Sequence, residues 1–444
     1  MTSVVEPTQV VVALPHLGMV LTALDEARER AGSDPGRLHA GTQTSDALEL
    51  ALVTLPDPER AAAALESWAE IGGDRGGPPL DRILAAVRAG FGRRYCGWSP
   101  LLGKNRMVGE VHGRQRSAAA PASAGAQDGQ AAGAQSRQAA GMRGRTAAGA
   151  QGRTAGGSAA PASGEVSHGG GGAPVAIARP AWADRPGATP NGVVVGLIDT
   201  AMVNHDYLTG AWTGPYPGAG DGRPVRAEAG HATFIAGLVR RHAPAATLSV
   251  HPVLDGTADA WTTAHRIVAA GRAGVDVLNL SFVCYTDDGD GPLVLATALE
   301  RLGRDTVVVA AAGNHGYLAD GRDHQPAFPA AFPNVVAVGA EGAPFSAKGP
   351  WITALAPGTD LESTYLSGTV SVWEDPDGPG PAPATRHDKT FQGYARWSGT
   401  SFAAAVVSAL IAERTVPGRV SAAEAAAELL APAAGGGPAR LGPG

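Results

Sequence analysis

Between residues 192 and 311 the sequence alternates short apolar runs with longer stretches of helical periodicity. The apolar runs predict strands at 192–198, 246–250, 275–280 and 306–311, and the stretches between them predict helices at 231–240, 258–273 and 292–304. Strands that are apolar throughout must be covered on both faces. The pattern therefore predicts an α/β fold, a doubly wound parallel sheet with helices on both sides.

The rest of the chain divides into parts of different composition. At 444 residues it is too long for one compact core. Residues 1–112 predict a small α/β domain, with strands at 9–14 and 47–55 and helices at 17–30, 58–71 and 80–91. Residues 113–174 are mostly Ala, Gly, Ser, Gln and Arg, which bury too little apolar surface to order, so we expect a disordered linker. The main domain is expected at 175–432 and a flexible tail at 433–444.

Charge and cysteine content exclude several function classes. A formal charge of -6 argues against nucleic acid as a partner, because such proteins usually carry a basic patch. The two cysteines, Cys96 and Cys284, are far apart, so they predict neither a disulfide framework nor a metal cluster and favour a reducing compartment. No apolar run is long enough to span a membrane, and residues 1–30 lack a signal-peptide pattern. We expect a cytoplasmic protein without membrane contact, metal or cofactor.

Five polar residues are expected at one edge of the predicted sheet. Loops that follow parallel strands gather at their carboxyl edge, and helices that run back along the sheet begin there. The five are Asp199, Ser281 and Asn314, which each follow a predicted strand, and His231 and Ser401, which each open a predicted helix. Each alone is more often a helix cap or a turn residue. Together and in this order they predict a catalytic site.

The needs of a serine nucleophile give these residues their roles. A serine hydroxyl reacts only when a base takes its proton, so Ser401 is the expected nucleophile and His231 the general base. Asp199 is expected to fix the tautomer of the imidazole and to stabilise its charged form. The side-chain amide of Asn314 and the backbone N–H of Ser401 are expected to bind the oxyanion.

Four motifs resemble those of the subtilisin-like serine protease family, and the resemblance spans residues 175–430. They are VGLIDT at 195–200, GHATFIAG at 230–237, AAAGN at 310–314 and SGTSFA at 398–403. The resemblance implies a subtilisin-like fold and endopeptidase activity on a protein or peptide substrate. It also implies that the substrate lies extended between two segments, Ser281-Phe282-Val283 and Ala311-Ala312-Gly313.

Three further segments lie near these motifs. The link from Gly237 to Ala243 is too short for the family's extended calcium loop, so no high-affinity calcium site is expected there. The acidic loop at 286–290 has two interpretations: its carboxylates favour substrates with Lys or Arg a few residues before the cut, or it is simply solvated. The proline-rich stretch at 373–381 predicts a surface loop, either a lid or a neutral insertion.

The end of the first domain carries two cations without an evident chemical role. Lys104 and Arg106 lie in a tail at 95–106. They either contact a partner or belong to a solvated loop anchored by Trp98, and the solvated loop is the prediction.

Two questions of function stay open at this level. The alternative to a serine endopeptidase is a catalytically silent pseudoprotease that binds peptides, and the complete set of catalytic residues favours the enzyme. For residues 1–112 the alternatives are a domain that docks an unknown protein partner and a cleaved inhibitory pro-segment. Because about sixty residues of linker follow this domain, we expect docking or regulation.

Overall fold

The structure is a computed structural model of the chain. It describes residues 5–32, 36–72, 76–110, 171–184, 188–213, 225–254, 258–286, 288–318, 321–374, 385–431 and 437–443. Most of the expected linker, residues 113–170, and part of the expected tail lie outside these ranges. Within them, no helix has the length and apolar character needed to cross a bilayer.

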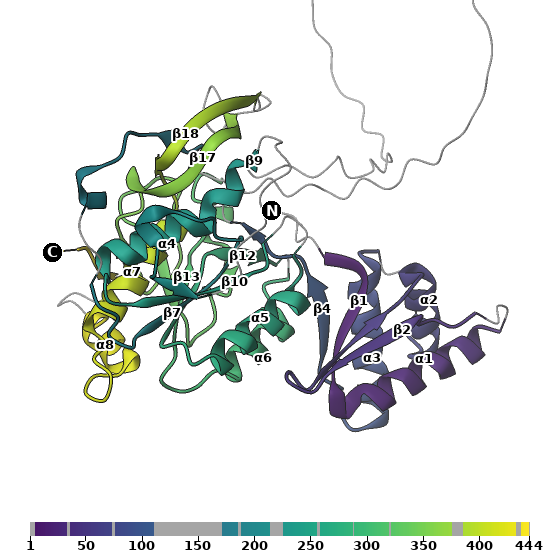
Figure 1. Cartoon of the computed structure of the whole chain (residues 1–444). Coiled ribbons are helices and arrows are strands. Elements are labelled where there is room, and N and C mark those ends of the chain that lie inside the picture. Colours follow the sequence, from purple (N-terminus) through teal and green to yellow (C-terminus); the bar gives the residue numbers. More distant parts are fainter. Residues whose placement is uncertain are drawn as a thin grey trace, which may run out of the picture. The chain divides into compact units, whose positions relative to one another are not determined.

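An eight-stranded parallel sheet forms the centre of the larger domain (Figure 1). In spatial order its strands are β19 (Ala439–Arg440), β16 (Ala354–Ala356), β15 (Val336–Ala340), β13 (Val307–Ala311), β11 (Val277–Leu280), β7 (Val194–Asp199), β10 (Thr247–Pro252) and β8 (Trp212–Thr213). The chain runs from β7 to β10 and then returns to β11 on the other side of β7. The order of the strands therefore reverses between β7 and β11, and ligands bind beyond the carboxyl ends of strands at such a point.

Helices cover both faces of this sheet (Figure 1). One face packs with α4 (His231–His242), α7 (Thr400–Arg414) and α8 (Ala422–Leu429), and the other with α5 (Ala260–Arg272) and α6 (Leu293–Glu300). Strand residues alternate between the two cores: Val307 and Val309 join the first, and Val308 joins the second. The predicted doubly wound α/β fold is confirmed, although α6 ends four residues before the predicted end at 304.

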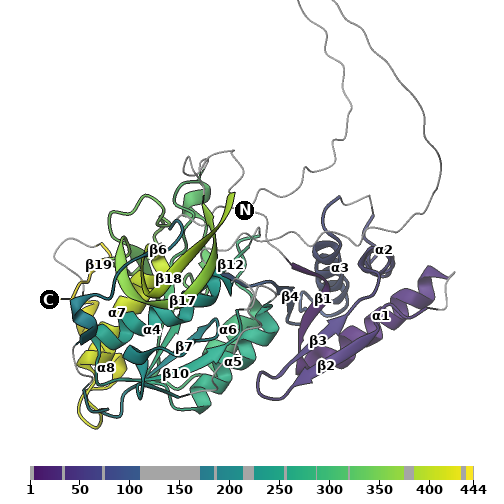
Figure 2. The same ribbon diagram turned by 45° about the horizontal axis from the view of Figure 1, so that its top comes forward.

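A long antiparallel hairpin precedes α7. It consists of β17 (Leu361–Glu374) and β18 (Thr385–Trp397), whose outer edges pair with β9 (Val225–Arg226) and β6 (Val175–Ala176). Figure 2 shows the hairpin beside α4, with which β17 is in contact. The predicted surface loop at 373–381 is wrong for its first two residues, because Trp373 and Glu374 pair with β18. The remainder of that segment lies outside the described residues.

The N-terminal domain is a four-stranded antiparallel sheet with helices on one face. The strands lie in the order β2 (Gly41–Ser45), β3 (Leu50–Thr54), β1 (Val5–Ala13) and β4 (Leu102–Arg106), and the helices are α1 (Leu17–Ala31), α2 (Pro58–Trp68) and α3 (Pro79–Arg94). The predicted strand at 47–55 is in fact β3 together with the turn that joins it to the unpredicted β2. Asp57 caps α2, since its side chain accepts a hydrogen bond from the N–H of Arg60 at 3.0 Å.

The second face of this N-terminal sheet packs on the larger domain. Along β1, Val10 and Val12 face the domain's own helices, whereas Val11 and Ala13 belong to a core shared with α5 and α6. Leu50 and Leu52 of β3 join the same shared core. Leaving a buried Val or Leu side chain exposed costs roughly 1.5–3 kcal/mol. Separating the two domains therefore exposes several apolar side chains to water at a substantial cost.

The tail of the N-terminal domain, predicted as a solvated loop over residues 95–106, is instead a strand over its last five residues, β4. Lys104 and Arg106 belong to β4 and are buried, whereas Trp98, the expected anchor, is an exposed large hydrophobic residue. The prediction failed because the groups that neutralise these cations lie far away in the sequence, chiefly at Asp288.

Candidate active site

A buried carboxylate and a buried imidazole meet at the edge of the sheet. Asp199 is the last residue of β7 and His231 the first of α4, so two elements that end and begin at the same edge bring them together. Nδ1 of His231 lies 2.8 Å from Oδ1 and 3.0 Å from Oδ2 of Asp199, and the two side chains are 1% and 0% exposed. Because a carboxylate only accepts, Nδ1 carries the proton and Nε2 is left to exchange protons with another group.

Thr200 fixes the relative position of these two elements. Its backbone N–H donates to Oδ1 of Asp199 at 2.7 Å, and its hydroxyl accepts from the N–H of Ala232 at 3.1 Å. One residue therefore holds both the carboxylate at the end of β7 and the first turn of α4.

Ser401 lies in the first turn of α7, fully buried. Its hydroxyl has no hydrogen-bond partner among the described residues, and the ring of its neighbour Phe402 lies 5.5 Å from the ring of His231. A serine at this position lies among the unpaired N–H groups of the helix start, where the helix dipole favours negative charge.

A chain of hydrogen bonds ties the start of α7 to β11. Ser408 of α7 donates to Oδ1 of Asn279 at 3.0 Å, and Nδ2 of Asn279 donates to the hydroxyl of Ser281 at 2.8 Å. That hydroxyl donates in turn to the carbonyl oxygen of Ser401 at 3.1 Å. The side chains of Ser408, Asn279 and Ser281 are all buried. These hydrogen bonds therefore form an internal polar network that fixes the position of Ser401 relative to β11.

Asn314 is held by Thr400, the residue before Ser401. The amide oxygen of Asn314 accepts from the N–H of Thr400 at 3.0 Å and from its hydroxyl at 2.9 Å. With its oxygen occupied, the amide has only N–H groups to offer elsewhere. The two bonds fix the orientation of the amide beside the residue that precedes Ser401.

The two expected substrate-binding segments differ in the backbone groups that they can present to a peptide. Phe282 and Val283 belong to β12 (Phe282–Tyr285), which pairs antiparallel with β5 (Gly109–Glu110) of the N-terminal domain and with β14 (Ala327–Phe328). The other segment, Ala311-Ala312-Gly313, is buried, and the N–H of Gly313 donates to the hydroxyl of Thr400 at 3.1 Å. Because that N–H is used internally, β12 is the better candidate for backbone pairing with a peptide.

Gly313 is required by the local geometry. Its φ is +102°, and a Cβ built there would lie 2.7 Å from the ring of His315. Any other residue would push the Asn314 loop away from Thr400.

The structure thus brings Asp199 and His231 into direct contact, joins Ser281 to Ser401, and places Asn314 against Thr400. Sequence reasoning missed Thr200, Asn279, Thr400 and Ser408. Asn279 and Ser408 did carry a signal, since each is a polar residue inside an otherwise apolar buried element.

In the described part of the chain, no group of three or more His, Cys, Asp or Glu side chains is arranged to hold a metal ion. Cys96 and Cys284 are free thiols, and burial raises the pKa of Cys284 to about 12.

Comparison with known proteins gives consistent matches. The sequence profile described as "Subtilase family" matches residues 190–435. A thermophilic serine proteinase of Bacillus sp. (strain AK1) is 35% identical over 162 residues, which cover 32% of this chain and 36% of that protein. Subtilisin BL of Lederbergia lenta is 31% identical over 205 residues, 42% of this chain and 71% of its own length.

Among solved structures, fervidolysin from Fervidobacterium pennivorans matches with a TM-score of 0.47 and 14% identity, over 91% of this chain and 54% of that one. The match to the first of the curated relatives spans about a third of that relative's length.

Proposed function

This chain belongs to the subtilase family, and on that premise we propose that it is a serine endopeptidase whose catalytic triad is Asp199, His231 and Ser401. The observation that carries the proposal is the buried hydrogen bond between His231 and Asp199. It leaves Nε2 of an imidazole as a base at the edge where α7 presents a buried serine.

In the proposed reaction, Ser401 Oγ attacks the carbonyl carbon of the substrate while His231 Nε2 takes its proton. The scissile C–N bond then breaks as His231 gives that proton to the leaving amine. Asp199 stabilises the imidazolium that exists between these steps. The amide of Asn314 and the N–H of Ser401 bind the oxyanion of each tetrahedral intermediate. Water then repeats the sequence on the acyl-enzyme and releases Ser401.

A fluorophosphonate probe tests the proposal, because it reacts only with an activated serine. We expect it to label Ser401 in the full chain and to fail with Ser401→Ala and with His231→Ala. Ser398→Ala is the matched control, since Ser398 lies three residues away and its hydroxyl accepts a hydrogen bond from the backbone N–H of Asp360 at 2.9 Å. A folded protein whose Ser401 stays unlabelled, both in the full chain and in residues 171–444 alone, is instead the peptide-binding pseudoprotease.

We also propose that the N-terminal domain inhibits this enzyme, a role favoured over docking of an unknown protein partner by one specific observation. Gly109 and Glu110 pair antiparallel with Val283 and Phe282, the strand proposed to bind substrate. A segment of the chain therefore takes the backbone hydrogen bonds that an extended peptide would need. The apolar core shared with α5 and α6 supports the same role, since it holds that segment in place.

A further inference from the structure

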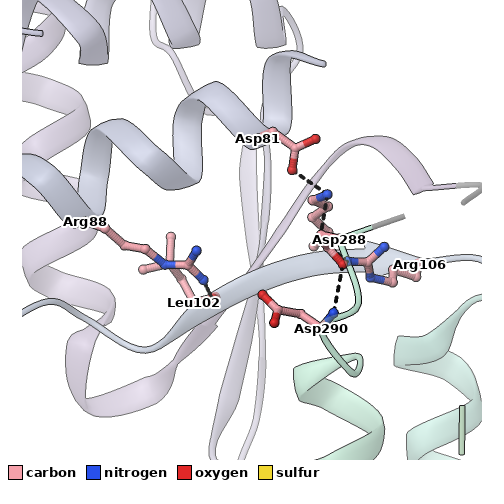
Figure 3. Close-up of polar contacts among 7 residues, drawn as sticks. Asp81, Arg88, Leu102, Arg106, Asp288 and Asp290 are labelled. Atoms are coloured by element: carbon pink, nitrogen blue, oxygen red, sulfur yellow. Dashed lines mark hydrogen bonds and ion pairs between the residues drawn. The ribbon is translucent and has the colours of Figure 1, made fainter. Parts of the chain in front are cut away.

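A single carboxylate of the catalytic domain holds two cations of the N-terminal domain. Asp288 follows β12 and belongs to the acidic loop at 286–290. Its Oδ2 lies 2.9 Å from Nζ of Lys104, and a terminal nitrogen of Arg106 donates to both of its oxygens, at 2.8 and 2.6 Å. Figure 3 shows the carboxylate of Asp288 beside the Arg106 guanidinium, with Asp290 on the same loop. Lys104 also pairs with Asp81 of its own domain.

These cations are buried and the carboxylate is not. The side chains of Lys104 and Arg106 are 3% and 4% exposed, whereas that of Asp288 is 31% exposed. Burial lowers the pKa of Lys104, but its hydrogen bonds to Asp81 and Asp288 outweigh burial and raise it. Burial likewise raises the pKa of Asp288, and the bonds from Lys104 and Arg106 outweigh this and lower it. Both pKa shifts favour the charged forms of Lys104 and Asp288.

The position of Asp288 relative to the substrate strand follows from the register of the chain. Residues 102–110 run from the N-terminal sheet to β12, where Glu110 pairs with Phe282 and Gly109 with Val283. Between these points the strand stays attached to the catalytic domain, since the N–H of Val108 donates to the carbonyl of Ala258 at 3.0 Å. Arg106 is four residues before Glu110. A peptide extended along β12 in the same register presents its side chain at that position to Asp288.

We propose that Asp288 is a specificity-determining residue that binds a Lys or Arg side chain of an extended substrate, four to six positions N-terminal of the residue opposite Phe282. The inference rests on the proposed peptidase function. In the described part of the chain, the cations that pair with Asp288 are Lys104 and Arg106. When they leave, the carboxylate sits partly exposed beside the path of any peptide on β12, and a charged partner there gains a charge-assisted hydrogen bond. The N-terminal domain fills this site with its own basic side chains.

Two internally quenched peptides test the proposal with the full chain. One has the sequence of residues 102–115, and the other has Gln in place of the residues corresponding to Lys104 and Arg106. The reference protein is Lys104→Gln/Arg106→Gln, in which Asp288 has lost its internal partners. Two derivatives of this reference protein carry one further substitution. One has Asp288→Asn. The other, the matched control, has Asp290→Asn at an exposed aspartate two residues further along the same loop. Fluorophosphonate labelling of Ser401 confirms that each variant is folded.

We expect the reference protein and its Asp290→Asn derivative to cleave the basic peptide with a kcat/KM about tenfold above that of the Gln peptide. The Asp288→Asn derivative should cleave the two peptides equally. Equal cleavage by the reference protein, or a preference that survives Asp288→Asn, overturns the proposal and leaves Asp288 as a contact between domains. Failure of every variant both to label and to cleave, together with failure of residues 171–444 to label, would instead contradict the peptidase function itself.

Discussion

The side chain of Asn314 is held by Thr400 through two hydrogen bonds to one oxygen, at 3.0 Å from the backbone N–H and 2.9 Å from the hydroxyl. The residue that precedes the proposed nucleophile therefore orients the proposed oxyanion donor. The amide of Asn314 is therefore oriented before substrate binds. A donor that is already oriented can stabilise a transition state without first having to move.

Replacing Asn314 by Ala should lower kcat by about 100 to 1,000-fold and leave KM nearly unchanged, because the lost bond forms only in the transition state. Steady-state hydrolysis of a short peptide measures both constants. Asn191→Ala is a suitable control, since Asn191 caps a backbone N–H in a loop at 3.0 Å. A near-normal kcat in Asn314→Ala would remove this residue from the site.

Thr400 should behave as a positioning residue. Thr400→Val keeps the shape of the side chain but removes the hydroxyl that bonds both Asn314 and the N–H of Gly313. We expect kcat to fall about tenfold with little change in KM, because one of the two bonds that orient the amide is lost. Thr400→Ser retains the hydroxyl and should restore most of kcat. A near-normal kcat in Thr400→Val would show that the hydroxyl does not position Asn314.

His315, next to Asn314, should make the protein less stable in acid. Burial lowers the pKa of His315 to about 4, more than its bond to the carbonyl of Gln325 raises it. The unfolded chain takes up a proton near pH 6.5 and the folded protein only near pH 4. The native state is therefore progressively disfavoured as the pH falls from about 6.5 to about 4, by up to roughly 3 kcal/mol.

Urea unfolding at pH 7 and pH 4.5 measures this effect. His315→Gln cannot take up the proton, so its free energy of unfolding should fall less between the two pH values than that of the unsubstituted protein. His324→Gln, at an exposed histidine that pairs with Asp323, should leave most of the fall in the free energy of unfolding in place. Parallel pH profiles for all three proteins would assign the acid sensitivity to other groups.

The fold of the catalytic domain was predictable because the information is local. Strands β7, β11 and β13 of the central sheet are mostly apolar runs, and the rule that loops gather at the carboxyl edge was enough to place Asp199 beside His231. β2 and β4 were missed for the opposite reason. Their residues, GTQTS and LGKNR, have no apolar alternation, and the buried cations of β4 pair with Asp288, which lies far along the chain.

Within the site, the sequence predicted the reacting groups but not the residues that position them. Thr400 bonds to Asn314, 86 positions away, and Asn279 bonds to Ser408, 129 positions away. Sequence periodicity does not reveal pairs this far apart. The occupied substrate strand was missed in the same way, since the pairing of Gly109 with Val283 depends on tertiary contact alone.

The role of the N-terminal domain can be decided with two fragments, residues 171–444 and residues 1–112. If the domain is an inhibitor, the larger fragment should react with the fluorophosphonate probe at Ser401 and cleave peptides. Adding the smaller fragment should slow both reactions, because Gly109 and Glu110 compete for β12 and the shared core holds them there. Lys104→Gln/Arg106→Gln in the smaller fragment should weaken inhibition about tenfold or more, since the two ion pairs to Asp288 are lost.

The two other roles give different results in the same experiment. A domain that docks a separate partner leaves the larger fragment equally active with or without residues 1–112. A folding chaperone leaves it inactive until the smaller fragment is present during refolding, and the larger fragment then stays active after the smaller one is removed. Slowed labelling that is relieved by Lys104→Gln/Arg106→Gln is expected of an inhibitor alone, because only an inhibitor must stay bound to act.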